Sequence, residues 1–423
     1  MPRALAPADN KISSKMIKRF LYIAACAVVL AGCVKDDTDF GSLVPADPGT
    51  DPVPITPISI EFDTSALTGE TETIPTDPTD VTYNDYVEND TFDRTVTVTF
   101  NGETATVTGT RTGITATVSG AHVTVNCAIG RMAIVASGTS TDGSLKIYSE
   151  HKFKLTLDGL TLTNPTGPAI NNQCGKTLYL VLGDGTTNSL ADGETYATPE
   201  LADEQAKGTL FSEGQIIFSG SGALTVNSVG AKAIVSDDYL RFRPGINIQA
   251  VSSVDHAIKA NDGIWIDGGV INASTSANGA KAIKCDYRTY VSGGRTTLIT
   301  SGAPVIETID GLSDTTSCAA IKSDSLMTVS GGTLRLKSIG EGGKGLNTGD
   351  DLVITGGTVQ VVTTGIKGLS SPKGVKADGD FTISGGSFYS YSAAAAPLEA
   401  ASQTIATGYT TLESKPRRLI IEN

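Results

Sequence analysis

The sequence predicts an all-β protein that folds as a parallel β-helix, a solenoid with three short strands in each coil. One pattern recurs six times between Ile234 and Gly386: an apolar residue followed in most copies by lysine, a short apolar strand, a glycine corner and another short strand. The 423 residues include 47 glycines and only 6% aromatics, which favours strands joined by tight turns. A fixed period of this kind indicates one unit stacked on copies of itself.

The spacing of the repeat decides between two repeat architectures. The anchors and the trailing glycines both step by 24, 25, 38, 25 and 29 residues. A β-propeller blade needs four strands and about 40 or more residues, so this period favours the β-helix. The longest step predicts a loop beside the stack between Arg295 and Ala319. The anchors are Ile234, Ile258, Ile283, Ile321, Leu346 and Val375, and the glycines are Gly245, Gly269, Gly294, Gly332, Gly357 and Gly386.

Alternation within one repeat assigns each side chain to the core or to the surface. Successive side chains of a strand face opposite sides, so an inward Ile258 leaves Lys259 outward. Trp265 lies between two isoleucines and is expected to face outward, as is Asn272 on the third strand. Gly269 suits the corner between these strands, where a Cβ would clash or φ must be positive.

Weaker strand patterns lie on either side of the repeat block. Residues 95–120 alternate threonine with apolar residues, and 153–162 and 178–182 are apolar strands. Residues 418–421 resemble a last strand that closes the core. We therefore expect the β-helix domain to span residues 93–423.

The N-terminal region has the features of an export signal. Lys18 and Arg19 precede an apolar stretch, residues 20–30, that is too short to span a bilayer as a helix. Leu30-Ala31-Gly32-Cys33 resembles a bacterial lipobox, which predicts a signal segment over residues 1–32, translation from Met16 and lipidation of Cys33. An ordinary signal peptide with a chance cysteine is the alternative.

The residues after Cys33 bear on localisation. Lys35-Asp36-Asp37 resembles the acidic export tag of Bacteroidetes surface lipoproteins and predicts an outer-membrane lipoprotein facing outside the cell; a periplasm-facing anchor is the alternative. No Lys or Arg lies between Asp36 and Asp93, and seven prolines lie between Pro45 and Pro78. Residues 33–92 are therefore expected to form an acidic, extended and mostly disordered stalk.

Charge and cysteines narrow the range of partners. The formal charge is −13 and would be −17 after removal of the first 32 residues, which argues against nucleic acid and leaves the lipid anchor as the only membrane contact. An acidic surface does permit divalent cations. Cys285 and Cys318 lie on neighbouring coils, and two interpretations stay open, a disulfide bridge or buried free thiols.

Three segments in a fixed order resemble the start of a carbohydrate-binding β-helix family typified by a clostridial cellulose- and polygalacturonate-binding protein. They are residues 155–162 (LTLDGLTL), 167–170 (GPAI) and 185–193 (GTTNSLADG). The resemblance covers residue 93 to the C-terminus and implies a right-handed β-helix similar to pectate lyases, bound calcium and polysaccharide binding. Residues 212–215 depart from it, with Ser-Glu-Gly-Gln where the family tends to have Ser-Lys-Asp-Asp.

Outward columns of side chains supply the candidate sugar site. Trp265 is the only tryptophan and is expected beside Tyr290 on the next coil and Arg241 on the preceding one. Aromatic faces suit pyranose stacking, and arginine suits uronate carboxylates. The alternative is that Trp265 covers a groove under a loop. Asn272 belongs to a polar third-strand column running from Asn247 to Tyr389.

A lysine column and the acids beside it have two readings. Lys259 and Lys284 are candidate sugar contacts, and the turn acids are candidate Ca²⁺ ligands. The alternative is a structural ladder in which each acid relieves the repulsion between stacked lysines. The candidate metal ligands are Asp237, Asp238, Asp286, Asp350 and Asp351.

Three functions follow from these patterns. The first is non-catalytic, calcium-assisted binding of a plant cell-wall type polysaccharide, such as cellulose or polygalacturonate, at the cell surface. The second is a calcium-dependent polysaccharide lyase or a hydrolase, although no spacing singles out a catalytic base or an acid pair. The third is a structural surface adhesin.

Overall fold

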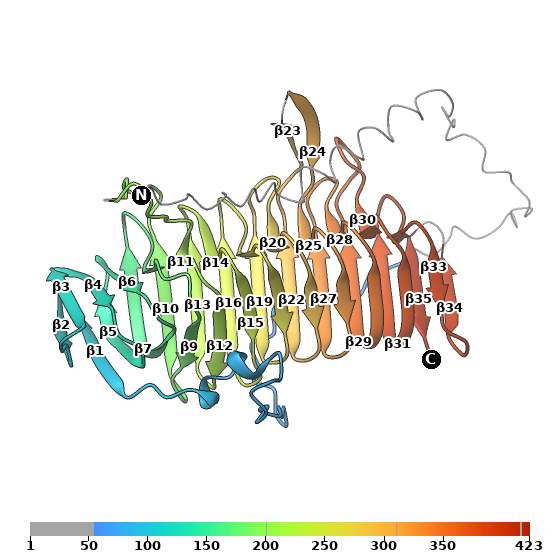
Figure 1. Ribbon diagram of the computed structural model, residues 1–423. Coiled ribbons are helices and arrows are strands. Elements are labelled where there is room, and N and C mark those ends of the chain that lie inside the picture. The colour runs from blue at the N-terminus through green and yellow to red at the C-terminus, as the bar shows by residue number, and fades with distance from the viewer. Residues whose placement is uncertain (1–54, 200, 310, 415–416) are drawn as a thin grey trace, which may run out of the picture. The chain divides into compact units, whose positions relative to one another are not determined.

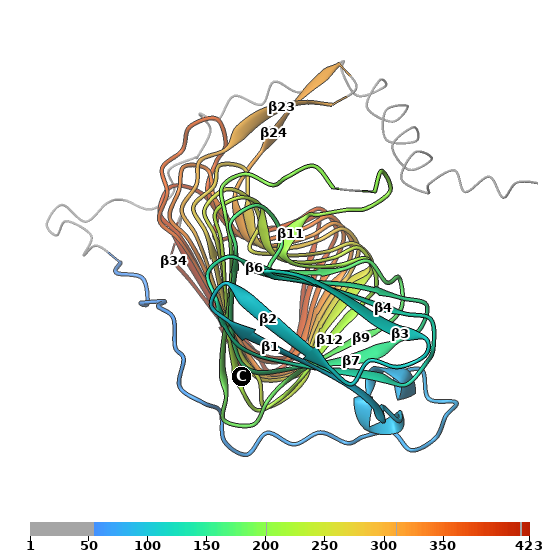
Figure 2. The ribbon, with the colours of Figure 1, turned by 90° about the vertical axis from the view of Figure 1, so that its left-hand side faces the viewer.

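Short strands stack in three ladders to form the wall of a solenoid (Figures 1 and 2). The computed structural model describes residues 55–199, 201–309, 311–414 and 417–423. Within each ladder, a strand pairs in parallel with the corresponding strand of the next coil. This arrangement confirms the predicted all-β solenoid with three strands per coil.

Ladder 1 carries the repeat anchors. Its strands are β4 (Ala121–Cys127), β6 (Gly143–Ser149), β8 (Ile170–Asn172), β11 (Gly208–Ser212), β14 (Lys232–Ser236), β17 (Ile258–Ala260), β20 (Lys281–Cys285), β25 (Ala319–Ser323), β28 (Lys344–Thr348), β30 (Lys373–Ala377) and β32 (Leu398–Glu399).

Ladders 2 and 3 follow ladder 1 in each coil. Ladder 2 includes β9 (Leu178–Leu182), β12 (Ile216–Gly220), β15 (Tyr239–Phe242), β18 (Gly263–Ile266), β21 (Thr289–Val291), β26 (Met327–Val329) and β33 (Gln403–Ile405). Ladder 3 includes β10 (Thr187–Asp192), β13 (Ala223–Ser228), β16 (Asn247–Ser252), β19 (Val270–Thr275), β22 (Arg295–Thr300) and β27 (Thr333–Ser338). Long strands run through both ladders, namely β5 (Met132–Ser140), β7 (Phe153–Asn164), β29 (Leu352–Thr363) and β31 (Phe381–Ser392).

The repeat has the register that its spacing predicts. In ladder 1 the six anchors from Ile234 to Val375 pair in one unbroken series. Their side chains are fully buried and form the core together with the inward residues of the other ladders. The six trailing glycines all have positive φ, between 72° and 91°, which is the conformation expected at these corners.

One predicted column is corrected by the register. Asn272 pairs with Gln249 on the preceding coil, so Asn247 is wrong as a member of the third-strand column. The corner between β15 and β16 has four residues, 243–246, where the corner between β18 and β19 has three, 267–269. The extra residue shifts every following position of β16 by one.

Antiparallel strands close both ends of the stack. At the N-terminal end, β1 (Arg94–Asn101) pairs with β2 (Thr104–Thr108), and β3 (Ile114–Ser119) pairs with β4. At the C-terminal end, β35 (Arg418–Glu422) pairs with β31 and with β34 (Thr410–Ser414). The predicted closing strand is thus confirmed, and the antiparallel strands cover edges of β1, β4 and β31.

The long step of the repeat is a hairpin. Strands β23 (Val305–Ile309) and β24 (Leu312–Thr316) form their own two-stranded sheet, which projects from the stack in both views (Figures 1 and 2). This confirms the loop expected between Arg295 and Ala319.

Residues 56–92, which we call the N-terminal strap, differ from the expected disordered stalk. They lie against ladders 2 and 3 and run from the last coils toward the first, with two short 3-10 turns, η1 (Tyr83–Asp85) and η2 (Val87–Asn89). In Figure 2 the strap is the blue chain along the outside of the solenoid. Residues 58–62 form no strand, although Ile60 is fully buried.

Several sequence predictions concern other parts of the chain. The signal segment 1–32, the lipidated Cys33 and stalk residues 33–54 lie outside the described residues. Cys285 and Cys318 are both buried free thiols, so the bridge is wrong and the alternative is confirmed. Within the described ranges, no helix has the length and apolarity to cross a bilayer.

Candidate functional site

Trp265 faces outward between two aromatic rings. It stacks on Tyr290 of the next coil, with ring centroids 5.5 Å apart and planes 15° apart, and it meets Tyr239 of the preceding coil at 76°. The ring also lies over Gly263, where a Cβ would come within 2.3 Å of it. Trp265 and Tyr290 are therefore neighbours as expected, but each ring already covers one face of the other, a face that a sugar would need.

Arg241 and Asn272 lie under the N-terminal strap. Arg241 is 9% exposed, and its guanidinium donates to Asp85 at 2.7 Å and to Asp267 at 2.6 Å. Asn272 has no exposed surface, and its Nδ2 donates to the backbone carbonyl of Asp63. These two predicted sugar contacts do not reach solvent while the strap is in place.

Lys259 and Lys284 belong to a ladder of ion pairs. The Lys284 ammonium lies 2.9 Å from Asp286 and 2.6 Å from Asp324, and Lys259 lies 3.1 Å from Asp286. Burial opposes ionisation of Asp286, yet the two lysines outweigh it and hold its pKa below its usual range. Each charge thus offsets its neighbour, as in the structural alternative.

The candidate calcium ligands do not converge. Asp237 pairs with Lys207, while Asp351 accepts the backbone N–H of Asp380. Burial, followed by repulsion from Asp262, raises the pKa of Asp238. In the part of the chain that the structure describes, no three His, Cys, Asp or Glu side chains gather in a metal-binding group. These acids do not fit a shared Ca²⁺ site, and no step below depends on one.

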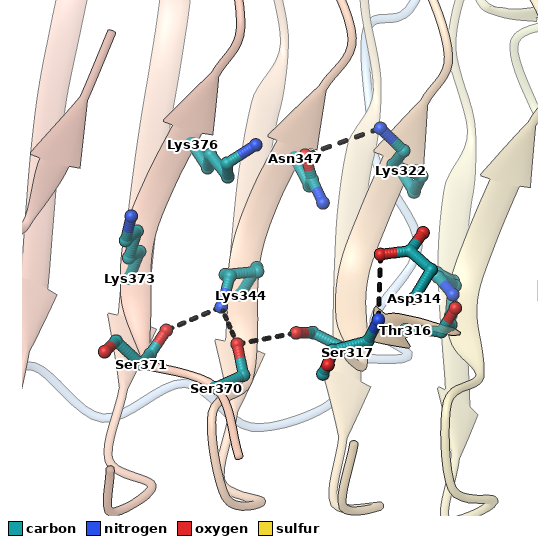
Figure 3. A pocket seen from close by; sticks show the side chains of 12 residues that line it. Asp314, Thr316, Ser317, Lys322, Lys344, Asn347, Ser370, Ser371, Lys373 and Lys376 are labelled. Atoms are coloured by element: carbon teal, nitrogen blue, oxygen red, sulfur yellow. Dashed lines mark hydrogen bonds between the residues drawn. The ribbon is translucent and has the colours of Figure 1, made fainter. Parts of the chain in front are cut away.

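A groove of about 420 Å³ lies on the outer face of ladder 1 (Figure 3). The end of the β23–β24 hairpin and the loop before β30 flank it. The lining is lysine, serine, threonine and asparagine with a single carboxylate. The residues are Lys281, Asp314, Thr315, Thr316, Ser317, Lys322, Lys344, Asn347, Ser370, Ser371, Lys373 and Lys376.

The ladder holds the groove side chains in two rows. Lys322, Asn347 and Lys376 pair in register on β25, β28 and β30, so they lie side by side in Figure 3. The second row consists of the first residues of β28 and β30, Lys344 and Lys373, which pair in register. Because backbone pairing fixes these positions, the cationic groups have a preset spacing along the stack.

Lys344 is the most constrained cation of the groove. It is 4% exposed, and its ammonium donates to Gly342 O at 2.7 Å, Ser370 Oγ at 2.8 Å and Ser371 O at 2.5 Å. Burial, with repulsion from neighbouring lysines, lowers its pKa to about 8. Lys344 therefore fastens the loop that forms one wall, and its donors are already in use.

Lys322 is the cation with donors to spare. Its ammonium makes only long contacts, 3.5 Å to Asn347 Oδ1 and 3.7 Å to Asp324. An ammonium has three donors, so a hydroxyl or carboxylate in the groove can bind here. Lys373 and Lys376 each pair with one carboxylate, Glu399 and Asp378.

The second lysine row was not predicted from the sequence. The signal was present, because Lys344 and Lys373 each stand three residues before the outward position of the repeat. Strict alternation, however, places a residue two before the inward anchor in the core. Only the structure shows that the ammonium of Lys344 reaches oxygens of the groove wall.

Two segments of the chain, residues 119–289 and 274–368, match the family model of the carbohydrate-binding domain-containing proteins. Together they span more than half of the sequence. The chain belongs to this family. The matched region includes Trp265 and, in the groove, Lys322, Lys344 and Asn347. The carbohydrate-binding part of the expected resemblance is confirmed, whereas a Bacteroidetes surface lipoprotein stays a prediction.

Among solved structures, the chain is similar to the polysaccharide lyase-like protein from C. thermocellum in its gadolinium derivative. The identity is 19% and the TM-score 0.44, over 69% of this chain and 99% of that chain. No curated protein matches this chain.

Proposed function

We propose that this family member binds an acidic polysaccharide without cleaving it, and that the ladder 1 groove is the contact surface. The observation that carries the proposal is the row of lysines and hydroxyls at coil spacing, on a chain whose formal charge is −13. A concave surface with a few convergent polar groups is the usual form of a ligand site. Ammonium groups favour uronate carboxylates, so polygalacturonate is the preferred ligand over neutral cellulose.

Binding without cleavage agrees with the lining of the groove. A glycoside hydrolase needs two carboxyl groups on either side of the scissile bond, whereas the groove is lined by Asp314 alone among the acids. Two basic groups beside the candidate acids, Lys284 and Arg241, have carboxylate partners at 2.9 Å or less, so both already belong to ion pairs.

Surface display forms part of the proposal, and calcium assistance is proposed on the family resemblance alone, since the five candidate acids do not form a shared site. The lipobox-like sequence before Cys33 supports a lipid anchor, and the acidic residues after it support display outside the cell. Metal analysis of the purified protein tests whether calcium is bound. Labelling of intact cells with an impermeant reagent tests surface display, because a periplasm-facing protein would stay unlabelled.

The groove is tested by neutralising its two outer lysines. We expect Lys322→Gln with Lys376→Gln to weaken retention on polygalacturonate about tenfold, because each lost charge-assisted contact is worth about 1.5–3 kcal/mol in part offset by solvent. The control is Lys154→Gln with Lys176→Gln, which removes the same charge from the first coils. Retention is measured on insoluble polygalacturonate and on cellulose, with calcium or with a chelator.

Three results would contradict the proposal. Equal loss in both double variants would indicate a general charge effect rather than a site. Release of unsaturated or reducing ends would indicate a lyase or a hydrolase. Binding to a host protein with no retention on either glycan would favour the adhesin.

A further inference from the structure

The N-terminal strap is an acidic chain lying along a row of basic side chains. Residues 56–92 contain nine acids and no Lys or Arg. Besides Lys152, which lies directly before β7 and pairs with Asp90, the solenoid face beneath the strap carries five cations along ladders 2 and 3. They are Arg241, Arg243, Arg295, Arg335 and Lys337, and each of them contacts the strap.

Arg243 makes the strongest of these contacts. It is 2% exposed and bound by two carboxylates, Glu72 at 2.8 and 3.1 Å and Glu88 at 2.9 and 3.1 Å. Its guanidinium also lies 4.4 Å from the ring centre of Tyr86. Paired hydrogen bonds of this kind are the geometry with which arginine binds carboxylates.

The other end of the strap is bound through its backbone oxygens. Arg335 donates to the carbonyls of Ser59 and Glu61 at 3.2 and 3.3 Å, and Lys337 donates to Ile60 O at 3.0 Å. Few apolar side chains add to this, since Ile60 and Tyr86 are the buried hydrophobic residues of the strap. The face therefore holds a linear chain mainly by donating hydrogen bonds to oxygens and carboxylates.

The strap supplies most of the negative charge at this face. Of the contacts with the five cations, the solenoid itself provides one carboxylate, Asp267 beside Arg241. Without the strap, these five cations, which are spread over the coils of β15, β22 and β27, and the amide of Asn272 would face solvent. This is a donor array suited to an anionic linear polymer.

We infer that the strap-covered face is a second surface for an acidic polysaccharide chain and that the strap is its intramolecular competitor. The inference extends the proposed function to a face other than the groove. The strap places carboxylates where those of a polyuronate would bind, and both cannot occupy the face together. Weakening the strap should therefore add binding capacity, and the effect should be confined to anionic glycans.

The test combines release of the strap with loss of the groove. In full-length protein carrying Lys322→Gln and Lys376→Gln, we add Glu72→Gln and Glu88→Gln to remove both charges from Arg243. The matched control adds Asp77→Asn and Asp80→Asn, which remove two strap charges that contact only Thr79 and Thr82. Hydrogen exchange of residues 56–92 reports release, and calorimetry with soluble oligogalacturonate reports binding.

We expect the Glu72/Glu88 variant to show faster exchange in the strap and an affinity about tenfold above that of the Asp77/Asp80 control. A neutral cello-oligosaccharide should show no gain. If the Glu72/Glu88 variant does not fold, Asp85→Asn takes its place, because it removes the strap carboxylate that binds Arg241 and Tyr239. A strap that exchanges faster without any gain in binding would overturn the inference and leave the groove untouched. Failure of the groove alone would appear as unchanged binding on Lys322/Lys376 replacement.

Discussion

At the scale of single residues, Lys281 and Lys344 combine burial with a positive charge. Burial is the main cause that lowers the pKa of each to about 8, helped by neighbouring lysines. Both ammonium groups donate to backbone carbonyls of nearby turns, Lys281 to Gly279 and Lys344 to Gly342. They are therefore charged at neutral pH and begin to lose the charge just above it.

This predicts that binding of an acidic glycan weakens as the pH rises from 7 to 9.5. An anionic ligand favours the protonated lysines, so binding should take up protons near pH 8. Calorimetry in two buffers of different ionisation enthalpy measures both effects. The charged and titratable groups that face the two lysines are Lys284, Lys322, Lys373, Lys376, Glu307, Glu399, Cys318 and His256. Constant affinity with no proton uptake across this range would contradict the prediction.

His256 predicts a second pH dependence, that of stability. Burial holds the pKa of its imidazole well below the usual value, although Asp255 beside it favours the charged form. The neutral ring accepts the backbone N–H of Lys281 at 3.2 Å. Below about pH 6.5 the unfolded chain binds a proton that the folded ring does not, so the folded state loses stability as the pH falls.

We expect His256→Asn to flatten the dependence of Tm on pH between about 6.5 and 4.5. The control is His151→Asn, a replacement at an exposed position. Differential scanning calorimetry at several pH values compares the slopes, which are independent of any constant cost of the substitution. Parallel slopes for the wild type and both variants would show that His256 does not set the acid limit.

At the scale of elements, the glycine corners determine how closely successive coils approach. Gly294 has φ of 74°, and a Cβ there would lie 2.5 Å from the carbonyl oxygen of Gly269 on the preceding coil. Gly159 in β7 has φ of 73° and no atom within 4 Å of such a Cβ. A comparison of alanine replacements at Gly294 and Gly159 therefore separates two free-energy costs, that of the positive φ and that of the contact between coils.

Replacement by alanine should destabilise the protein at both positions, but more at Gly294. The positive φ costs about 1–2 kcal/mol in each variant. The contact with Gly269 adds about 1–3 kcal/mol at Gly294, since the neighbouring backbone cannot move away without shifting a coil. Urea unfolding measures both free energies. Equal losses would mean that the coils adjust freely at this corner.

The sequence predicted those elements whose structure is set by residues within one coil. The anchors from Ile234 to Val375 fell into register, because apolar alternation and glycine corners act within one coil. The register shift after the corner 243–246 was not foreseen, since one additional corner residue leaves the apolar pattern intact. The second lysine row was missed because alternation places Lys344 on the inward side, whereas its ammonium reaches Ser370 in the groove lining.

At the scale of the whole molecule, the strap changes which surface is free. It covers Arg241 and Asn272, two residues that the sequence had suggested for sugar binding, and it leaves the outer face of ladder 1 open. The hairpin and the loop with Ser370 then turn that open face into a groove. The candidate site consequently depends on segments that come from different coils.

The sequence by itself determined the coil, its three strands, its glycine corners and most of the outward columns, but not the column of Asn247. These features follow from patterns of a few residues, because a solenoid coil contacts only its neighbours. Only the tertiary structure decided which outward columns meet solvent. Residues 56–92 contact distant coils, and the contacts of Asp85 with Arg241 and of Glu72 with Arg243 each join residues more than 150 positions apart. The alternation of residues along a strand predicts whether a side chain faces inward or outward. It does not predict whether a distant segment covers an outward side chain.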